Sequence, residues 1–199
     1  YINVFLYVDV PEYSEYISKE DIPTIKELDN ILVAASDNPM MYLIFALVIR
    51  CALTASEVCN LKETHISEDK ANRFFILFEE NNRVRYVKIP EDVVPSLISY
   101  MKQTNRAGEY LFYNQRGLVL KVRNLQSLVK KYVNMAGIEK DYTIQDIRNA
   151  AICYMKAFGA DDLSTAEYVG VEGRWMYRYD KVIHEIDLQP VDLVKIQIK

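Results

Sequence analysis

Arg148 stands alone near the start of an apolar helical run, and arginines and aromatic residues cluster at 174–179, where the stretch that begins at Tyr142 ends. A guanidinium is planar, permanently charged and suited to binding pairs of phosphate oxygens. Charged side chains are rarely buried without a partner. Arg148 is therefore either a phosphate ligand or half of an ion pair, with Asp146 or another acid as its counter-ion.

Two helices are expected in the first third of the chain. Residues 18–35 form an amphipathic run in which Ser18 suits the N-cap, Asp21 the third position of a capping box, and Pro23 the first turn. An Asp-Asn-Pro sequence then breaks the chain. Residues 39–61 are so uniformly apolar that they predict a helix at the centre of the core.

A β-hairpin is predicted over residues 73–89, where two runs rich in aromatic and β-branched residues flank Glu-Glu-Asn-Asn. Its second strand carries Arg83, Arg85 and Lys88, which we expect to present positive charge either to a DNA backbone or to solvent. Residues 90–101 predict a further helix.

Residues 121–136 predict a helix whose apolar residues recur every three or four positions and face the core. The formal net charge of the chain is −4, yet residues 71–140 hold twelve Lys or Arg against six Asp or Glu. A local excess of charge governs attraction more than the total does. The distribution therefore fits a nucleic-acid partner as well as an ordinary solvated face. The outward-pointing basic residues of this helix are Lys121, Arg123, Lys130 and Lys131.

The composition indicates one folded globular domain, since 50% of the 199 residues are hydrophobic and 26% are charged. The longest apolar run, residues 40–49, is too short to cross a bilayer, so no membrane partner is expected. Cys51, Cys59 and Cys153 lie in apolar patterns without metal-binding spacing. They indicate reduced core thiols in a cytoplasmic protein, with no metal site and no cofactor.

The sequence Ala-Leu-Thr-Ala-Ser-Glu-Val-Cys-Asn-Leu at 52–61 resembles the Gly-Leu-Arg-x-Ser-Glu-Leu-x-x-Leu motif of the tyrosine recombinase, or phage integrase, catalytic domain. The resemblance places Thr54 where the family has an arginine that grips the scissile phosphate, and a hydroxyl cannot replace that charge. Arg50, one helical turn earlier, could reach the same face. Where the family has a proton-donating lysine, the hairpin turn offers Asn-Asn-Arg at 81–83.

The second family motif, His-x-x-Arg-His, matches residues 145–149, which keep Arg148 and replace both histidines by amides that do not titrate near neutral pH. A Val-Gly-Val sequence matches the family's Leu-Gly-His, so Val171 replaces a phosphate-binding side chain. The nucleophilic tyrosine of the family falls near Tyr179, or two residues earlier at Tyr177. Tyr179 could equally serve in packing or in stacking on DNA.

The resemblance implies a mixed α+β, mainly helical fold with a small antiparallel sheet, covering residues 17–182. Residues 1–16 would be a linker or N-terminal extension, and 183–199 a tail that packs on its own domain or joins a second protomer in a homo-oligomer. A DNA-clamping domain ahead of Tyr1 is also expected from the resemblance.

Losing one preorganised donor slows such chemistry about 10²–10³-fold. The sequence therefore predicts a catalytically inactive, recombinase-derived protein that binds double-stranded DNA, as a regulator or repressor of a phage or mobile element. Its vestigial catalytic positions are Thr54, Gln145, Arg148, Val171 and Tyr179. Its predicted DNA contacts are Arg83, Arg85, Lys121, Arg123, Lys130, Lys131, Arg148, Arg174 and Arg178.

Two other functions stay open at this level. A divergent but active recombinase would cleave and rejoin DNA with Tyr179 or Tyr177, and Arg50 would supply the missing charge. A module that binds only proteins is the second, favoured by the acidic ends of the chain.

Overall fold

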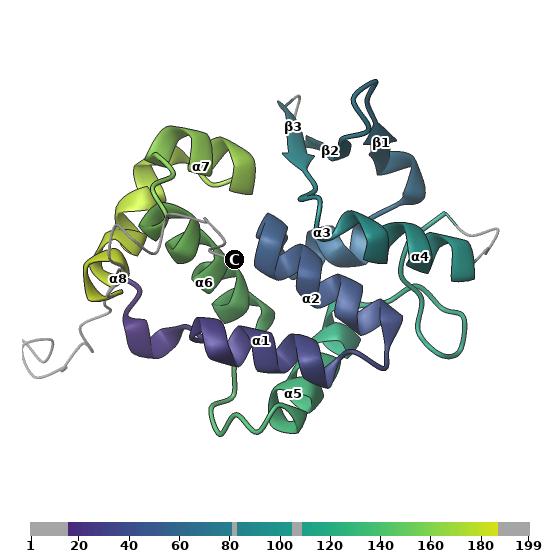
Figure 1. Cartoon of the computed structure of the whole chain (residues 1–199), viewed down its shortest axis with the longest axis horizontal. Coiled ribbons are helices and arrows are strands. Elements are labelled where there is room, and N and C mark those ends of the chain that lie inside the picture. Colours follow the sequence, from purple (N-terminus) through teal and green to yellow (C-terminus); the bar gives the residue numbers. More distant parts are fainter. Residues whose placement is uncertain (1–15, 81–82, 105–108, 187–199) are drawn as a thin grey trace, which may run out of the picture.

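The computed structural model describes residues 16–80, 83–104 and 109–186. It is mainly helical, with one three-stranded antiparallel sheet of order β1-β2-β3, which confirms the predicted fold class. In Figure 1, α6, α7 and α8 lie on one side and the sheet with α3 and α4 on the other, while α1 runs beneath both. The helices are α1 (Ile25–Ala34), α2 (Pro39–Cys51), α3 (Ala55–Asn60), α4 (Val94–Thr104), α5 (Val122–Met135), α6 (Ile144–Ala157), α7 (Asp162–Val169) and α8 (Asp180–Glu185). The strands are β1 (Ile66–Glu68), β2 (Phe74–Glu80) and β3 (Arg83–Lys88), and the 3-10 helices are η2 (Lys19–Asp21), η3 (Glu63–His65) and η4 (Gly173–Tyr179).

The single helix predicted over residues 18–35 is wrong, because the chain forms η2 and then α1. The expected capping box of Ser18 and Asp21 is present, but it caps only the short η2. The residue before Pro23 is extended, as the proline ring demands, and this ends η2. A second capping box, in which the Thr24 hydroxyl accepts the Glu27 N–H at 3.2 Å, then starts α1.

The helix predicted over residues 39–61 is also divided, into α2 and α3. Ala52 follows α2 with φ 51 and ψ 39, the left-handed conformation that glycine adopts freely and alanine adopts at a cost of about 1–2 kcal/mol. Ala52 stands where the recombinase motif has a glycine, so the backbone explains that glycine. Thr54 then caps α3 together with Glu57.

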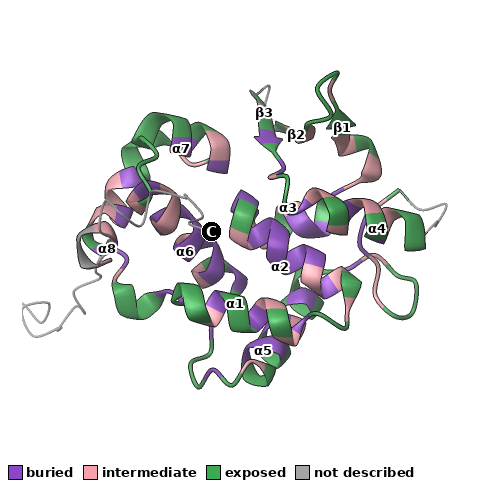
Figure 2. Ribbon diagram, in the orientation of Figure 1, coloured by how far each residue is buried: buried purple, intermediate pink, exposed green. Residues whose placement is uncertain are grey.

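α2 is the centre of the core, as its composition predicted. It contacts α1, α4 and α6, and most of its length is buried (Figure 2). Full burial of one leucine, isoleucine or phenylalanine contributes about 1.5–3 kcal/mol, so this helix is the main hydrophobic anchor of the fold. Its buried residues are Met41, Leu43, Ile44, Phe45, Ala46, Leu47, Val48 and Cys51.

The predicted hairpin is confirmed as β2 and β3, with Ile76 opposite Val87 and Phe78 opposite Arg85. Side chains alternate along a strand, so Arg85 shares the inward face of the buried Val87, whereas Lys88 is exposed on the other face. Arg85 and Lys88 therefore point to opposite faces of the sheet. β1 extends the sheet beyond the predicted hairpin.

α5 confirms its predicted orientation, with Leu125, Val129 and Val133 buried and the basic residues on the exposed side. Lys121 is the N-cap of this helix rather than its first residue. The helix predicted from residue 90 begins only at Val94.

The three cysteines are buried and free, as predicted. Burial raises the pKa of Cys51 and of Cys153 to about 12, and that of Cys59 to about 11, which disfavours their thiolates. None of the helices within residues 16–80, 83–104 and 109–186 combines the length and the apolar character that a bilayer crossing needs. The predicted N-terminal extension up to residue 15, and the tail from residue 187, lie outside the described residues.

Candidate nucleic-acid interface

α6 starts with a capping box that takes Asp146 away from Arg148. The Asp146 carboxylate accepts the Thr143 N–H at 2.8 Å and the Thr143 hydroxyl at 2.7 Å. This box explains locally why the helix begins at Ile144. The alternative that Asp146 neutralises Arg148 is therefore wrong.

Arg148 is anchored by backbone carbonyls. Its Nε donates to the Ala52 carbonyl and its Nη2 to the Val169 carbonyl, each at 2.8 Å, and 6% of the residue is exposed. Burial lowers the pKa of Arg148 from its ordinary value, and the nearby Tyr179 and Glu57 oppose that shift. The guanidinium thus joins the corner after α2 to the C-terminal end of α7, where helix carbonyls favour a cation.

A second guanidinium reaches the same region from β3. Arg85 Nη2 forms an ion pair with Glu57 of α3, and its Nη1 donates to the Tyr168 carbonyl at 3.1 Å. The two side chains are 14% and 18% exposed, respectively. Tyr168 also donates its hydroxyl to the Lys88 carbonyl at 2.7 Å, which ties α7 to the end of β3.

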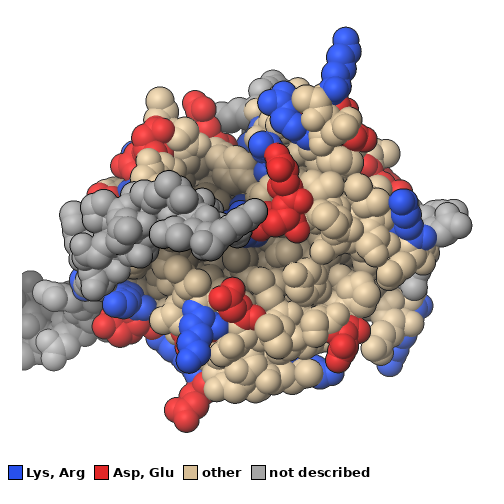
Figure 3. All heavy atoms as spheres, viewed as in Figure 1, with Lys and Arg blue, Asp and Glu red and all other residues tan. Residues whose placement is uncertain are grey.

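An open groove of ≈1290 Å³ lies between β3 and α7. Arg85, Glu57 and Gly170 line it, together with side chains such as Tyr86 and Leu163. Figure 3 shows this face hollowed between its two sides, with charges of both signs on the rim. The ion pair of Arg85 and Glu57 is among the groups that line the groove.

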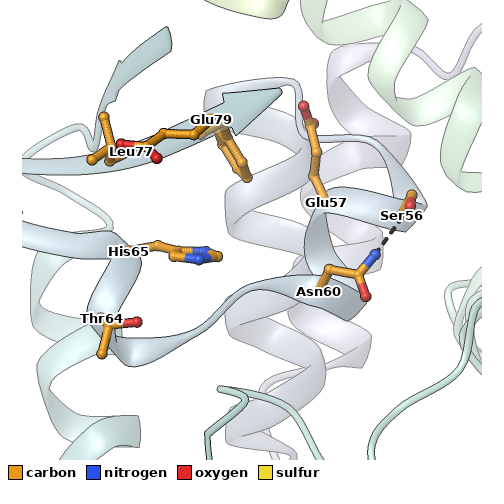
Figure 4. A pocket seen from close by; sticks show the side chains of 8 residues that line it. Ser56, Glu57, Asn60, Thr64, His65, Leu77 and Glu79 are labelled. Atoms are coloured by element: carbon orange, nitrogen blue, oxygen red, sulfur yellow. Dashed lines mark hydrogen bonds between the residues drawn. The ribbon is translucent and has the colours of Figure 1, made fainter. Parts of the chain in front are cut away.

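A smaller pocket of ≈440 Å³ lies between α3, η3 and β2 (Figure 4). Polar and apolar side chains both line it: the Asn60 amide donates to the Ser56 hydroxyl at 3.3 Å, and the His65 imidazole reaches in from η3. Glu57 lines both this pocket and the groove, so its carboxylate lies in the partition between the two hollows.

Thr54 and Gln145, which the family resemblance matched to catalytic positions, form side-chain hydrogen bonds within the chain. The Thr54 hydroxyl accepts the Glu57 N–H at 3.1 Å and caps α3. Gln145 donates its amide to the side chain of Asn149 at 2.8 Å, so the two residues that replace the histidines bond to each other. Val171 is half-buried against the core.

Tyr179, at the end of η4, is 4% exposed, and burial is the main reason that its pKa is raised. The positive charge of Arg148 acts on its phenol in the opposite direction, which places Tyr179 within electrostatic reach of that guanidinium. Tyr177 is half-buried and packs edge-on against Tyr16, with 5.6 Å between ring centroids. Both tyrosines are thus held in side-chain packing.

The C-terminal elements are fastened to α6 by Lys156. Its Nζ bonds the Asp162 carboxylate at 2.8 Å, the Asp180 carboxylate at 2.5 Å and the Met176 carbonyl at 3.2 Å. The side chain is 5% exposed, so this cation joins α7, η4 and α8 at a buried point.

Several predicted contacts lie away from the groove. Arg50 pairs with Asp92 at 3.0 Å, and both side chains are exposed. Lys130 pairs with Asp141 at 2.7 Å on an exposed face.

Arg174 pairs with Glu172 at 2.7 Å and lies over the Trp175 ring, while Arg178 is half-buried within η4. The predicted interface is therefore dispersed, and Arg148 and Arg85 are the pair that the fold brings together. Lys121, Arg123 and Lys131 are exposed on or beside α5, and the side chain of Arg83 is outside the described residues.

Sequence reasoning missed the roles of Glu57 and Lys156. The Thr-x-x-Glu spacing from Thr54 to Glu57 is a capping signature and could have located the carboxylate, although not its arginine partner. Lys156 falls on the apolar face of α6 with Ile152, and a lysine buried at such a position signals acidic partners nearby.

The chain is similar to known proteins both in sequence and in fold. Residues 15–172 match the model of the phage integrase family. The tyrosine recombinase XerC of Caldanaerobacter subterraneus subsp. tengcongensis is 28% identical over 131 residues, which are 63% of this chain and 36% of that protein. The chain thus spans little more than a third of that relative.

Two solved structures share the fold. The XerA recombinase superposes with a TM-score of 0.72 at 20% identity, over 86% of this chain and 60% of that one. The Tn1549 transposon integrase, in complex with transposon right end DNA, gives a TM-score of 0.69 at 13% identity, over 94% of this chain and 66% of that one.

Proposed function

Because this chain belongs to the phage integrase family, we propose that it is a catalytically inactive member that binds double-stranded DNA without cutting it. The observation that carries the proposal is Arg148. Its charge is held by the carbonyls of Ala52 and Val169, and within the described residues no carboxylate forms a salt bridge with it. A buried guanidinium without a neutralising acid is poised to receive an external anion, and a DNA phosphate is the anion that such a fork fits best.

Three further features support the DNA partner. The groove between β3 and α7 is open to solvent, and α5 presents exposed basic side chains. The Tn1549 integrase, which shares this fold, was solved with transposon end DNA. Because the net charge of the chain is −4, DNA must be bound through such local basic features rather than through the charge of the whole protein. Contacts between basic side chains and phosphates release counter-ions, so the affinity for DNA should fall steeply as the salt concentration rises.

The proposed inactivity rests on what occupies the catalytic positions. Neither Thr54 nor Val171 can carry charge, and Gln145 and Asn149 do not exchange a proton near neutral pH. Strand transfer needs several charged donors around the phosphate and a proton for the leaving oxygen. Tyr179 is buried with a raised pKa, which further disfavours its use as a nucleophile.

A protein that holds DNA without cutting it acts by occupying a site. The finer proposal is therefore a regulator or repressor of a phage or mobile element, acting in the cytoplasm together with an N-terminal DNA-clamping domain. A homo-oligomer formed through the tail belongs to the same proposal.

One observation favours a second candidate, a divergent active recombinase. Tyr179 lies within electrostatic reach of Arg148, whose positive charge favours ionisation of the phenol, and this is the pairing that strand cleavage would use. Arg50 does not assist it, because its partner is Asp92.

Gel shifts with fragments of the host genome, using the full-length protein, test the proposal. We expect at least one fragment to be retained below micromolar protein at low salt, with the logarithm of Kd rising linearly with the logarithm of salt concentration. If no fragment is retained under these conditions, DNA binding is wrong and a module that binds only proteins takes its place.

A further inference from the structure

We propose that Arg85 supplies, from β3, the second phosphate-binding charge that is missing at Thr54, and that Glu57 is its built-in counter-ion. The ligand would be a DNA phosphodiester held between Arg85 and Arg148. This inference rests on the proposed function and gives it a site. The charge would thus have moved from the start of one helix to a neighbouring strand, while the region it serves stayed in place.

The two guanidinia are anchored to neighbouring carbonyls. Arg85 Nη1 donates to the Tyr168 carbonyl at 3.1 Å, and Arg148 Nη2 donates to the Val169 carbonyl at 2.8 Å. Both carbonyls belong to the last turn of α7, whose dipole attracts cations. A guanidinium has five N–H donors, so each arginine keeps donors for an additional acceptor.

Gly170 makes the approach of Arg85 possible. A Cβ atom built on Gly170 would lie 2.7 Å from Arg85 Nη1 and 2.9 Å from Arg85 Cζ, closer than real Cβ contacts come. Gly170 also has φ 72, which glycine adopts without strain. Any side chain at this position would displace the Arg85 guanidinium from its position beside the Tyr168 carbonyl.

Thr54 indirectly holds the counter-ion in place. One oxygen of Glu57 accepts the Thr54 N–H at 2.8 Å, and the other faces Arg85 Nη2. The backbone N–H at position 54 therefore positions the carboxylate, and the carboxylate positions Arg85. The three ionised groups Arg85, Arg148 and Glu57 sum to one positive charge, enough to attract a phosphodiester but weaker than two uncompensated arginines.

Arg85 and Glu57 are reachable from solvent. Arg85, Glu57 and Gly170 line the groove, and the pocket of Figure 4 opens on the other side of Glu57. A DNA backbone lying in the groove would meet Arg85 first, since Arg148 is the more deeply buried of the two arginines.

The first test is the affinity of the full-length protein and of its Arg85→Gln variant for the fragment that wild type retains most tightly. We expect Kd to rise about tenfold, because a charge-assisted hydrogen bond is lost. The slope of log Kd against log salt should fall by about 0.9, the value of one phosphate contact. Arg73→Gln is the matched control, since Arg73 pairs with Asp69 outside the groove and its loss should change neither quantity.

The second test uses Glu57→Gln, which should lower the stability to urea and raise the affinity for DNA. The variant should be less stable to urea, because the Arg85 ion pair is lost, yet bind DNA about three- to tenfold more tightly, because the counter-ion is gone. In an Arg85→Gln background the tightening should disappear. Glu167→Gln, which removes an acid from the same groove, should have a smaller effect that is equal in both backgrounds.

The outcomes distinguish a failure of the proposed DNA binding from a failure of the role of Arg85. If wild type binds no DNA, the proposed function fails and this inference with it. If wild type binds but Arg85→Gln lowers only stability, leaving Kd and the salt slope unchanged for the folded fraction, Arg85 is a structural brace and the inference is overturned. Equal tightening by Glu57→Gln in both backgrounds would overturn the role of Glu57 as counter-ion.

Discussion

Arg148 and Arg85 lie at the same end of α7 but are held by different chemistry. Arg148 is buried and bonds two neutral carbonyls, whereas Arg85 is at the groove and pairs with a carboxylate as well as a carbonyl. The first keeps its full charge, and the second shares it with Glu57. The two arginines thus differ in how much uncompensated positive charge they present to an external phosphate.

The difference bears on the proposal that a family site can keep phosphate binding without catalysis. Phosphate binding needs charge in the right region and does not depend on which element supplies it. Proton transfer depends on one group with a suitable pKa at one position. Under our proposal, an arginine on a neighbouring strand supplies in binding the charge that Thr54 lacks, while no residue takes over the proton transfer expected at the positions of Gln145 and Val171.

Arg148→Gln should give the largest effect. Two buried carbonyls lose their donor, so the free energy of unfolding should fall by about 1–3 kcal/mol. The Kd for DNA should rise at least tenfold, about the worth of one charge-assisted hydrogen bond. Urea unfolding and gel shifts measure the two quantities. Arg148→Lys is the matched control, because it keeps the charge without the fork and should recover only part of the affinity.

If Arg148→Gln bound DNA as tightly as wild type, the contrast between the two arginines would be reversed. Arg148 would then be a structural link between the α2 corner and α7, and the groove would bind DNA through Arg85 and surface residues alone.

Lys156→Met should separate stability from binding. It removes the cation that fastens Asp162 and Asp180 to α6, and we expect a loss of about 1–2 kcal/mol, since both acids are about half exposed. DNA affinity per folded molecule should stay unchanged, because Lys156 lies outside the groove. A parallel loss of affinity would show that the α7 end depends on this link.

The same link predicts a pH dependence. Burial alone would lower the pKa of Lys156, but its hydrogen bonds to Asp162 and Asp180 outweigh burial and raise it. A raised folded-state pKa contributes stability below the ordinary lysine pKa of 10.5, and that stability is lost as pH rises through the folded value. Wild type and Lys156→Met should therefore differ in unfolding free energy at neutral pH and converge only above pH 10.5.

Thr54→Arg should have the smallest effect alone and a larger one in combination. It removes the α3 cap, at a cost of about 1 kcal/mol. It should add little affinity for DNA, because Arg85 already supplies the charge. In the Arg85→Gln protein, however, it should restore Kd to within about threefold of wild type, since Glu57 is then free to orient the new guanidinium. Failure of this rescue would separate position 54 from the function of Arg85.

Much of the fold could be predicted because it follows from local patterns. The apolar α2, the amphipathic α5 and the β2–β3 hairpin each have a period or a turn sequence that specifies them. The breaks were harder to predict. Pro23 forces the residue before it into an extended conformation, which divides the predicted first helix. Ala52 adopts a positive φ, which an alanine in the sequence does not predict.

The site could be predicted only in part. The sequence identified Arg148 as a residue in need of a partner, but the carbonyls of Ala52 and Val169 come from remote segments and leave no trace in local sequence. Arg85 was expected on an exposed strand face. Strand alternation in register with Val87 turns it inward, and the register depends on pairing with β2.

A suicide substrate tests the central claim, binding without cleavage, most directly. Wild-type protein would be incubated with nicked duplexes made from a retained fragment, and denaturing gels would reveal any covalent protein–DNA adduct. Tyr179→Phe and Tyr177→Phe would be run beside it. We predict no adduct with any of the three proteins, although all bind the duplex. An adduct that forms with wild type and disappears in Tyr179→Phe would contradict the proposal and identify the chain as an active recombinase.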